Sequence, residues 1–213
     1  MRYLWGLCLG LVLLGPAYSA SADEVVPPDR MLEQTAREML TVLRQRQQEL
    51  RGNTAELYRL VEDILVPHVD LELLARFVLG KHWRNATEEQ RTRFTYAFKD
   101  MLIRFYATSM LEYLDYQVRF FPVTLSPGDK LTVVRSEFYR GHQAPIAVNY
   151  RVALRDGEWK AFDVTIDNIS VVTNYRGSFD SIIQNEGLES LLRQMDAWNQ
   201  DKAVNLKNPN QRD

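Results

Sequence analysis

Apolar residues recur every three or four positions along three stretches in the first part of the chain. These stretches are Leu32 to Leu50, Leu57 to Leu65 and Leu73 to Val78. Such spacing is typical of helices that bury one face, so three helices are predicted. The breaks between and after them fall at Gly52-Asn53, Pro67 and Gly80, residues that commonly end helices, and Asp70 suits the N-cap of the third helix.

A longer helix is predicted to follow. Thr87-Glu88-Glu89-Gln90 has the form of a capping box, in which the first and last side chains each bind the backbone of the other residue. Apolar residues continue at helical spacing from Phe94, so the helix could reach Leu114. A bend or break near Thr108-Ser109 is predicted because the helix would otherwise be long for a small domain.

From Tyr116 the period of the pattern changes to two, which is typical of strands with one buried face. The predicted strands are Gln117–Val123, Lys130–Tyr139, 146–154 and a partner strand with Phe162, Val164 and Ile166 on one face. Asp156-Gly157 predicts a tight hairpin between the last two strands.

Two further helices are predicted near the C-terminus, over residues 173–185 and 188–198. Residues 201–213 are polar and are predicted to be a flexible tail. The order of helices, antiparallel strands and helices indicates an α+β fold of about four strands, with helices against one face of the sheet. Residues 23–200 are predicted to form a single domain.

The first 22 residues have the pattern of a secretory signal peptide. Arg2 is positive, an apolar run extends from Leu4 to Leu14, and Ala20-Ser21-Ala22 forms a small-residue cleavage site. The alternative is a membrane anchor, but the run is well short of the roughly 20 residues that cross a bilayer. Cleavage after Ala22 and export into the periplasm are therefore predicted.

Charge and cysteine content narrow the possible functions of the exported chain. Removing the first 22 residues takes away Arg2 and leaves 25 basic and 28 acidic residues, a net charge of −3. This balance excludes the strongly basic surface of a nucleic-acid-binding protein. Cys8 is the only cysteine, so the domain contains no disulfide and its core alone must stabilise it.

Known catalytic and metal-binding motifs are missing from the sequence. His68, His82 and His142 lie in three different segments and form no H-x-x-x-H pair, so no metal site or cofactor is predicted. There is neither a G-x-S-x-G nor a G-x-x-x-x-G-K-[ST] motif.

One enzymatic alternative remains open. Asp163 or Asp167 could act as a base in an apolar cavity, with Tyr150 as a hydrogen-bond donor, because burial raises the pKa of a carboxyl group. The competing interpretation is structural. Under it, Asp163 is hydrogen-bonded at the end of the sheet and Asp167 is a turn residue.

Aromatic residues are plentiful on the predicted inward faces of both helices and strands. Pattern alone does not separate a core that these rings fill from a cavity that they line, and it favours the filled core. The residues are Phe77, Trp83, Phe94, Phe98, Phe105, Tyr106, Tyr113, Phe162, Tyr175 and Phe179.

Two stretches resemble the MlaC family, also called the toluene-tolerance auxiliary family. The first is ILVPHVD at 64–70 with ARFVLGKHWR at 75–84, and Gln90, Phe94 and Phe98 follow. The second is WKAFDV-x-I at 159–166, which continues into ISVV-x-NYR-x-x-F at 169–179. The resemblance covers roughly residues 30–200. It departs at Asp167-Asn168, where the family usually has Glu-Gly, and this makes the turn before Ile169 less certain.

The resemblance implies a fold similar to the nuclear-transport-factor cone: a curved antiparallel sheet closed by helices over a deep apolar cavity. By position in the family pattern, twelve residues are expected to line the cavity and bind lipid tails. They are Phe77, Trp83, Phe94, Phe98, Leu102, Val148, Tyr150, Val152, Phe162, Val164, Tyr175 and Phe179.

It also implies a function without catalysis. Family members carry phospholipid through the periplasm between an outer-membrane lipoprotein–porin complex and an inner-membrane ABC transporter with a substrate-binding ring. Since arginine suits phosphate oxygens, the candidates for the lipid headgroup are Lys81, Arg84, Asn174 and Arg176. Two alternatives stay open: the aspartate-based enzyme, and an interaction adaptor with a filled core and no bound lipid.

Overall fold

The helices begin and end at residues that suit those positions. The computed structural model describes residues 25–200, so the predicted signal peptide and polar tail lie outside the described residues. Pro28 occupies the first position of α1, where its missing N–H costs nothing, and the helix therefore starts before the predicted Leu32. Asn53 and Asp70 cap α3 and α4 through side-chain hydrogen bonds, as Thr87 does for α5 in a complete capping box.

Seven α-helices and two short 3₁₀ helices are found in the described part of the chain. The first group is α1 (Pro28–Gln45), α2 (Gln47–Gly52), α3 (Thr54–Leu65), η1 (Val66–His68), α4 (Leu71–Leu79), η2 (Gly80–Arg84) and α5 (Glu88–Met110). After the sheet come α6 (Val171–Glu186) and α7 (Leu188–Gln200). The long helix ends at Met110 rather than at Leu114, close to the predicted break.

The sheet is antiparallel throughout and follows the chain order β1-β2-β3-β4-β5. Its strands are β1 (Gln117–Phe120), β2 (Leu131–Tyr139), β3 (Ile146–Arg155), β4 (Glu158–Ile166) and β5 (Ile169–Ser170). The predicted first strand was too long at its end, because Pro122 has no N–H to donate to a neighbouring strand. The prediction of about four strands missed β5, which has only two residues.

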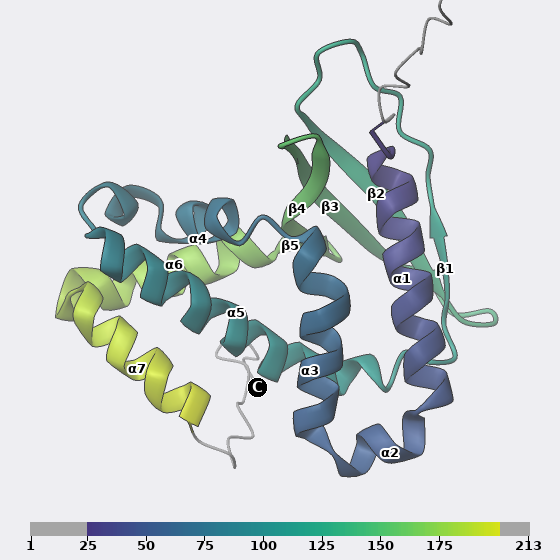
Figure 1. The fold of residues 1–213 in the computed structure, drawn as a ribbon, viewed down its shortest axis with the longest axis horizontal. Helices are drawn as coiled ribbons and strands as arrows, with labels where there is room; N and C mark the ends of the chain where they lie inside the picture. The colour runs from purple at the N-terminus through teal and green to yellow at the C-terminus, as the bar shows by residue number, and fades with distance from the viewer. Residues whose placement is uncertain (1–24, 201–213) are drawn as a thin grey trace, which may run out of the picture.

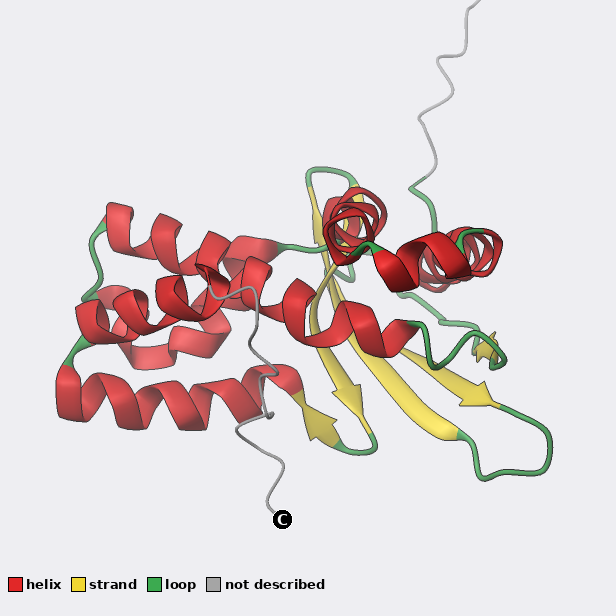
Figure 2. Ribbon diagram, turned by 90° about the horizontal axis from the view of Figure 1, so that it is seen from below, coloured by secondary structure: helices red, strands yellow, loops and turns green. Residues whose placement is uncertain are grey.

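The two faces of the sheet differ in polarity, and the strand register determines which residues lie on each face. The inner face carries Val134, Tyr150 and Val152, which pack with Met31 and Leu32 of α1. The outer face is mostly polar and carries the Arg119–Glu137 ion pair and the neighbouring side chains of Arg151 and Asp163. In Figure 1, α1 crosses in front of the sheet, and Figure 2 shows one group of helices above the sheet and a second group extending away to its left.

A β-bulge corrects one predicted position. Val152 pairs with Ala161 while Arg151 pairs with Asp163, so Phe162 is an extra residue in β4. The bulge removes Phe162 from the alternation, and its ring stacks with Phe77 at a centroid distance of 5.2 Å beneath the guanidinium of Arg151. The prediction that Phe162 shares one face with Val164 and Ile166 was therefore wrong.

Buried apolar residues form three separate clusters rather than one continuous core. The first joins α4, η2, α5, α6 and α7. The second joins α1, α2 and α3 to the C-terminal half of α5, and the third joins α1 to the inner face of the sheet. Helix α5 takes part in the first two, and Figure 1 shows it running from α7 to behind α3. The fold class predicted from the sequence, α+β with helices and an antiparallel sheet, is confirmed.

Candidate functional site

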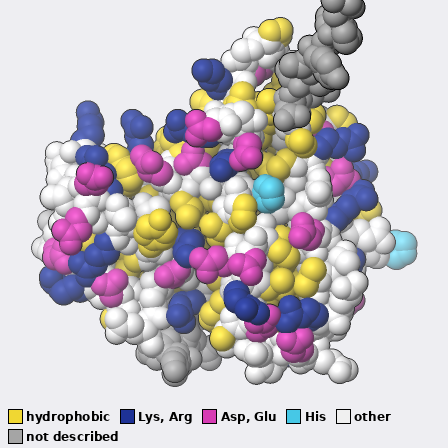
Figure 3. Space-filling view, viewed as in Figure 1, with side chains coloured by type: hydrophobic (Ala, Val, Ile, Leu, Met, Phe, Trp, Pro, Cys, Tyr) yellow, Lys and Arg dark blue, Asp and Glu magenta, His cyan; other side chains and the backbone are white. Residues whose placement is uncertain are grey.

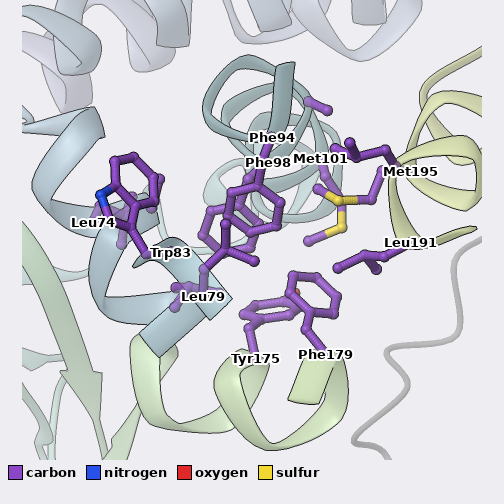
Figure 4. Packing of buried hydrophobic residues seen from close by; sticks show 14 of the residues in the cluster. Leu74, Leu79, Trp83, Phe94, Phe98, Met101, Tyr175, Phe179, Leu191 and Met195 are labelled. Atoms are coloured by element: carbon purple, nitrogen blue, oxygen red, sulfur yellow. The ribbon is translucent and has the colours of Figure 1, made fainter. Parts of the chain in front are cut away.

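Four of the twelve predicted lining residues pack against one another inside the helical cluster. Phe98 contacts the rings of Phe94, Tyr175 and Phe179 at centroid distances of 5.6, 5.2 and 5.8 Å. All four are buried, and their edge-to-face and stacked geometries are those of a well-packed core. Figure 4 shows the rings meeting between α5 and α6, with Met195 and Leu191 of α7 closing the group. Burial also raises the pKa of the Tyr175 phenol, which interacts with the Tyr106 hydroxyl.

Four other predicted residues lie on the inner face of the sheet. Val148, Tyr150 and Val152 alternate along β3, and Val164 of β4 is directly opposite Tyr150. Val152 is fully buried with Val134, whereas Tyr150 and Val164 are only half-buried. Tyr150 also stacks with the ring of Phe120 on β1 at 6.0 Å, so aromatic and aliphatic groups continue across the inner face.

Tyr150 has a phenol with a raised pKa and a side chain that is only partly buried. Burial among protein atoms raises the pKa of its phenol to about 12, with a smaller opposing effect from a hydrogen bond with Ser136. Its side chain nevertheless keeps accessible surface. Tyr150 is therefore partly desolvated by its protein neighbours on the inner face without being fully covered by them.

The remaining predicted lining residues lie beside the helical cluster or beneath Arg151. Trp83 is buried in the helical cluster, and Phe77 and Leu102 are partly buried beside it. Phe77 extends from α4 to Phe162 of β4, where Arg151 lies over both rings at 5.1 and 4.7 Å. The structure thus divides the predicted set into a packed helical group, an inner-face group, and the Phe77–Phe162 stack, which lies beneath Arg151 of the outer face.

The candidate headgroup residues lie on η2 and α6 and are largely engaged with the protein. Lys81 forms an ion pair with Asp180 at 2.9 Å, and Arg176 donates from Nε to the carbonyl oxygen of Phe77 at 2.6 Å. Arg84 is exposed and Asn174 is half-buried. The pKa of Asp180 is lowered by hydrogen bonds from Lys81 and then from His82, so this carboxylate competes with any phosphate for the ammonium group of Lys81.

The backbone N–H groups at the N-terminus of α6 already have hydrogen-bond acceptors within the protein. Asp163 is buried and accepts hydrogen bonds from the Val172 backbone N–H at 3.0 Å and from the Ser170 hydroxyl at 2.8 Å. Ser170 in turn caps the helix by accepting from the Thr173 N–H. The structural interpretation of Asp163 is confirmed, because its oxygens hold the junction between β4 and α6.

The arrangement required for an aspartate-based enzyme is not assembled. Asp163 pairs with Arg151 on the outer face, whereas Tyr150 is on the inner face, so the sheet separates the two groups. Asp167 is an exposed turn residue with φ 46°, as its structural interpretation predicted. Residues 25–200 contain no group of three His, Asp or Glu side chains placed to hold a metal ion.

The surface carries charges of both signs. In Figure 3, basic and acidic side chains alternate across the visible face with small apolar areas between them. Two surface hollows of about 500 and 560 Å³ are lined by largely polar residues of α1 and α2 and include none of the predicted lining residues. Within residues 25–200, each helix is too short or too polar to cross a membrane.

Sequence reasoning missed several inner-face residues. Phe120, Phe138, Ile146 and Ser136 share that face with Tyr150 through the register. Their alternation along β1 to β3 was visible in the sequence, and pairing those strands would have found them. Ile169 could not be assigned to this face from the sequence, because β5 has only two residues and is too short to show an alternating pattern.

Comparison with protein families agrees with this architecture. The family model described as MlaC protein matches residues 33–197. The chain is 27% identical to the toluene tolerance protein ttg2D of Pseudomonas putida over 89% of this chain and 87% of that protein. It is 22% identical to the intermembrane phospholipid transport system binding protein MlaC of Haemophilus influenzae, over 90% of this chain and 91% of that protein.

Among solved structures, the chain is similar to a phospholipid-binding protein from Ralstonia solanacearum, which was determined in complex with a phospholipid. The two superpose with a TM-score of 0.74 at 25% identity. The match covers 81% of this chain and 97% of the other. The similarity therefore includes the sheet and helices described above, not an isolated motif.

Proposed function

The chain belongs to the MlaC family, and on this premise we propose that it is a periplasmic carrier that binds the acyl tails of phospholipids. The observation that carries the proposal is the likeness to a protein solved with a bound phospholipid, over most of both chains. The names of the two relatives describe tolerance, binding and transport rather than catalysis. A carrier needs no catalytic group.

The chemistry of the cargo explains why a carrier is required. Each methylene exposed to water costs about 0.8 kcal/mol, so about thirty methylenes of a diacyl lipid cost roughly 24 kcal/mol. A lipid that crosses an aqueous compartment alone would meet most of that cost. A protein that surrounds the tails with apolar side chains removes it, provided that the interior offers apolar surface that the protein itself does not fill.

The separation of the apolar clusters supports such an interior. A domain of this size usually has one continuous core, whereas here there are three clusters, each with apolar residues packed against it that are only partly buried. Tyr150 and Phe120 pack against the sheet cluster, Leu102 and Phe105 against the helical cluster, and Met110 against the cluster of α1, α2, α3 and α5. We place the tails among these residues, between the inner face of the sheet and α5.

The two groups of predicted lining residues then take different roles. Val148, Tyr150 and Val164 would contact tails directly, while Val152 closes the covered end of the sheet. The packed rings around Phe98 would form a rigid wall behind Leu102. Because these rings contact one another, their contribution to lipid binding is mechanical support.

Direct headgroup contact remains a proposal for Lys81, Arg84, Asn174 and Arg176. Arg176 is its sharpest test because its Nε already binds Phe77. Arg176→Glu should lower retention of anionic phospholipid by removing a cation and adding repulsion. Arg176→Gln keeps a donor without the charge, so it separates the electrostatic effect from loss of the Phe77 contact. Unchanged retention in both variants would assign Arg176 to the structure alone.

The route of transport follows from the family. We propose that lipid passes between an outer-membrane lipoprotein–porin complex and an inner-membrane ABC transporter with a substrate-binding ring. One relative is named as the binding protein of an intermembrane phospholipid transport system, which supports this assignment. The signal-peptide pattern of residues 1–22 supports the periplasm as the compartment.

Purification without detergent tests the central proposal. The protein from periplasmic extract should carry intact phospholipid in roughly stoichiometric amount, because the desolvation cost of the tails makes their escape slow. Native mass spectrometry before and after organic extraction measures occupancy and the number of chains. Lipid should also raise the melting temperature, since the unfolded chain offers no site. A homogeneous lipid-free protein that takes up none from liposomes would refute the carrier function.

A further inference from the structure

The inner face of the sheet is covered by α1 near Val152 and is uncovered where β4 meets β5. At the end beneath α1, Val134 and Val152 are both 0% exposed and contact the cluster that contains Met31 and Leu32. Further along, Val148 is 7% exposed. At the opposite end, Ile166 is 40% and Ile169 63% exposed. One end of the apolar face is therefore closed and the other is open.

Strand register places both exposed isoleucines on this face. Ile166 is directly opposite Val148 on β3, and Ile169 is directly opposite Ile166. Directly paired residues in an antiparallel sheet point to the same side, so the apolar row runs from Tyr150 and Val148 out to the isoleucines without interruption.

A tight turn holds the isoleucine pair in position. Asp167 and Asn168, the two residues between them, both have positive φ angles of 46° and 67°. This is the two-residue hairpin geometry that Asp and Asn tolerate better than other non-glycine residues. The turn is fixed to β3 by a 3.0 Å hydrogen bond from the Asp167 N–H to the Ala147 carbonyl oxygen.

A second exposed aliphatic pair, on β2, differs from Ile166 and Ile169 in the face of the sheet that it occupies. Leu131 and Val133 on β2 are 65% and 49% exposed, so they match the isoleucines in size and exposure. Their register partners are Ala153 and Arg151, which places them on the outer face. The sheet itself separates that pair from the inner face, so exposure alone does not connect it to the tail site.

We infer that Ile166 and Ile169 form the rim of the portal through which phospholipid acyl chains enter and leave the space over the inner face. This inference rests on the proposed carrier function and goes beyond it by locating the entry. A chain leaving a bilayer would contact the two isoleucines before it reaches Val148 and Tyr150. Methylenes covered at the rim are not exposed to water during passage, so an apolar rim speeds exchange.

Matched double variants test the portal. The protein with Ile166→Ser and Ile169→Ser is compared with Leu131→Ser and Val133→Ser, using liposomes of phosphatidylethanolamine and phosphatidylglycerol that contain a pyrene-labelled phosphatidylglycerol. The isoleucine variant should take up labelled lipid at least about fivefold more slowly, which corresponds to about 1 kcal/mol in the barrier. Its final occupancy and melting temperature should stay close to those of the unmodified protein, because both residues are exposed. The outer-face variant should exchange at the unmodified rate.

The possible results separate the inference from the proposal beneath it. Equal rates for both variants, whether unmodified or equally slowed, would overturn the portal assignment. An unmodified protein that takes up no lipid would instead refute the carrier function.

A labelled cysteine gives an independent measurement. Residues 25–200 contain no cysteine, so Ile169→Cys and Val133→Cys can each carry a polarity-sensitive fluorophore. Liposomes should shift the emission of the first to the blue and leave the second unchanged. The opposite pattern, or equal shifts at the two sites, would contradict the portal.

Discussion

Truncation of Phe98 distinguishes a packed aromatic cluster from a lipid-lining surface. The ring is buried and contacts Phe94, Tyr175 and Phe179 at centroid distances below 6 Å. Phe98→Ala leaves a cavity that these rigid neighbours cannot fill, and such changes cost about 3–5 kcal/mol. For a domain of this size, each kcal/mol lowers the melting temperature by about 2–4 °C, so a fall of roughly 10 °C is expected.

The lipid content should respond differently from the stability. Because Phe98 would support the tail site only from behind, the folded Phe98→Ala protein should retain most of its phospholipid. Phe138→Ala is the matched control: its ring is half-buried on the inner face, near the open end. It should lower the melting temperature by only a few degrees but reduce lipid retention. Differential scanning calorimetry and lipid extraction from the same samples measure both quantities.

One result would refute this reasoning. If Phe98→Ala lost its lipid while its lipid-free melting temperature fell by less than about 2 °C, the aromatic cluster would be a lining surface and not a filled core. Comparison of lipid-free samples is essential, since bound lipid adds its own stabilisation.

Three further predictions follow from the same structure. Protein recovered from the periplasm should begin at Asp23 by intact mass, and a retained N-terminus in the membrane fraction would contradict export. Val152→Glu should unfold the domain by circular dichroism, because it buries an unpaired charge beside Val134 and Trp159, and a folded variant with full lipid content would show that this end is open. The pKa of Tyr150 rises from 10 in the unfolded chain to about 12 in the folded protein. The neutral phenol therefore contributes fully to the free energy of unfolding below pH 10, and this contribution disappears as the pH rises towards 12. Tyr150→Phe should therefore lessen the loss of unfolding free energy between pH 9 and 12, by at most about 2–3 kcal/mol in denaturant titrations, and an unchanged pH dependence would place the phenol in solvent.

Local sequence signals predicted most element boundaries because their causes are local. The Thr87 capping box, the Asp70 cap and the Asp156-Gly157 hairpin each depend on a few neighbouring residues, and all three form as predicted. Two features were not predicted, the start of α1 and the bulge in β4, although their causes are also local. Pro28 begins a helix rather than preceding one, and the bulge at Phe162 has no sequence pattern of its own.

The candidate site was less predictable because it depends on contacts between distant segments. Helical spacing places Phe98 and Tyr175 on inward faces, but only the packing of α5 against α6 shows that they meet each other. Likewise, nothing local to Tyr150 indicates that its neighbours leave it half-covered, or that α1 covers Val152 and leaves Ile166 exposed. A pattern identifies which side chains face inward, whereas the amount of space among them depends on the whole fold.

The division of the interior into three clusters also has a consequence for hydrogen exchange. Backbone amides of α5 near Phe94 and Phe98 lie beside fully buried side chains of the helical cluster, so they should exchange only through global unfolding. Amides at the open end of β3 and β4 lie where side-chain cover is incomplete, and they should exchange through local openings. Bound phospholipid should then slow exchange in the open strands far more than its effect on global stability explains. The protein would keep one region rigid and leave another dependent on its cargo for protection.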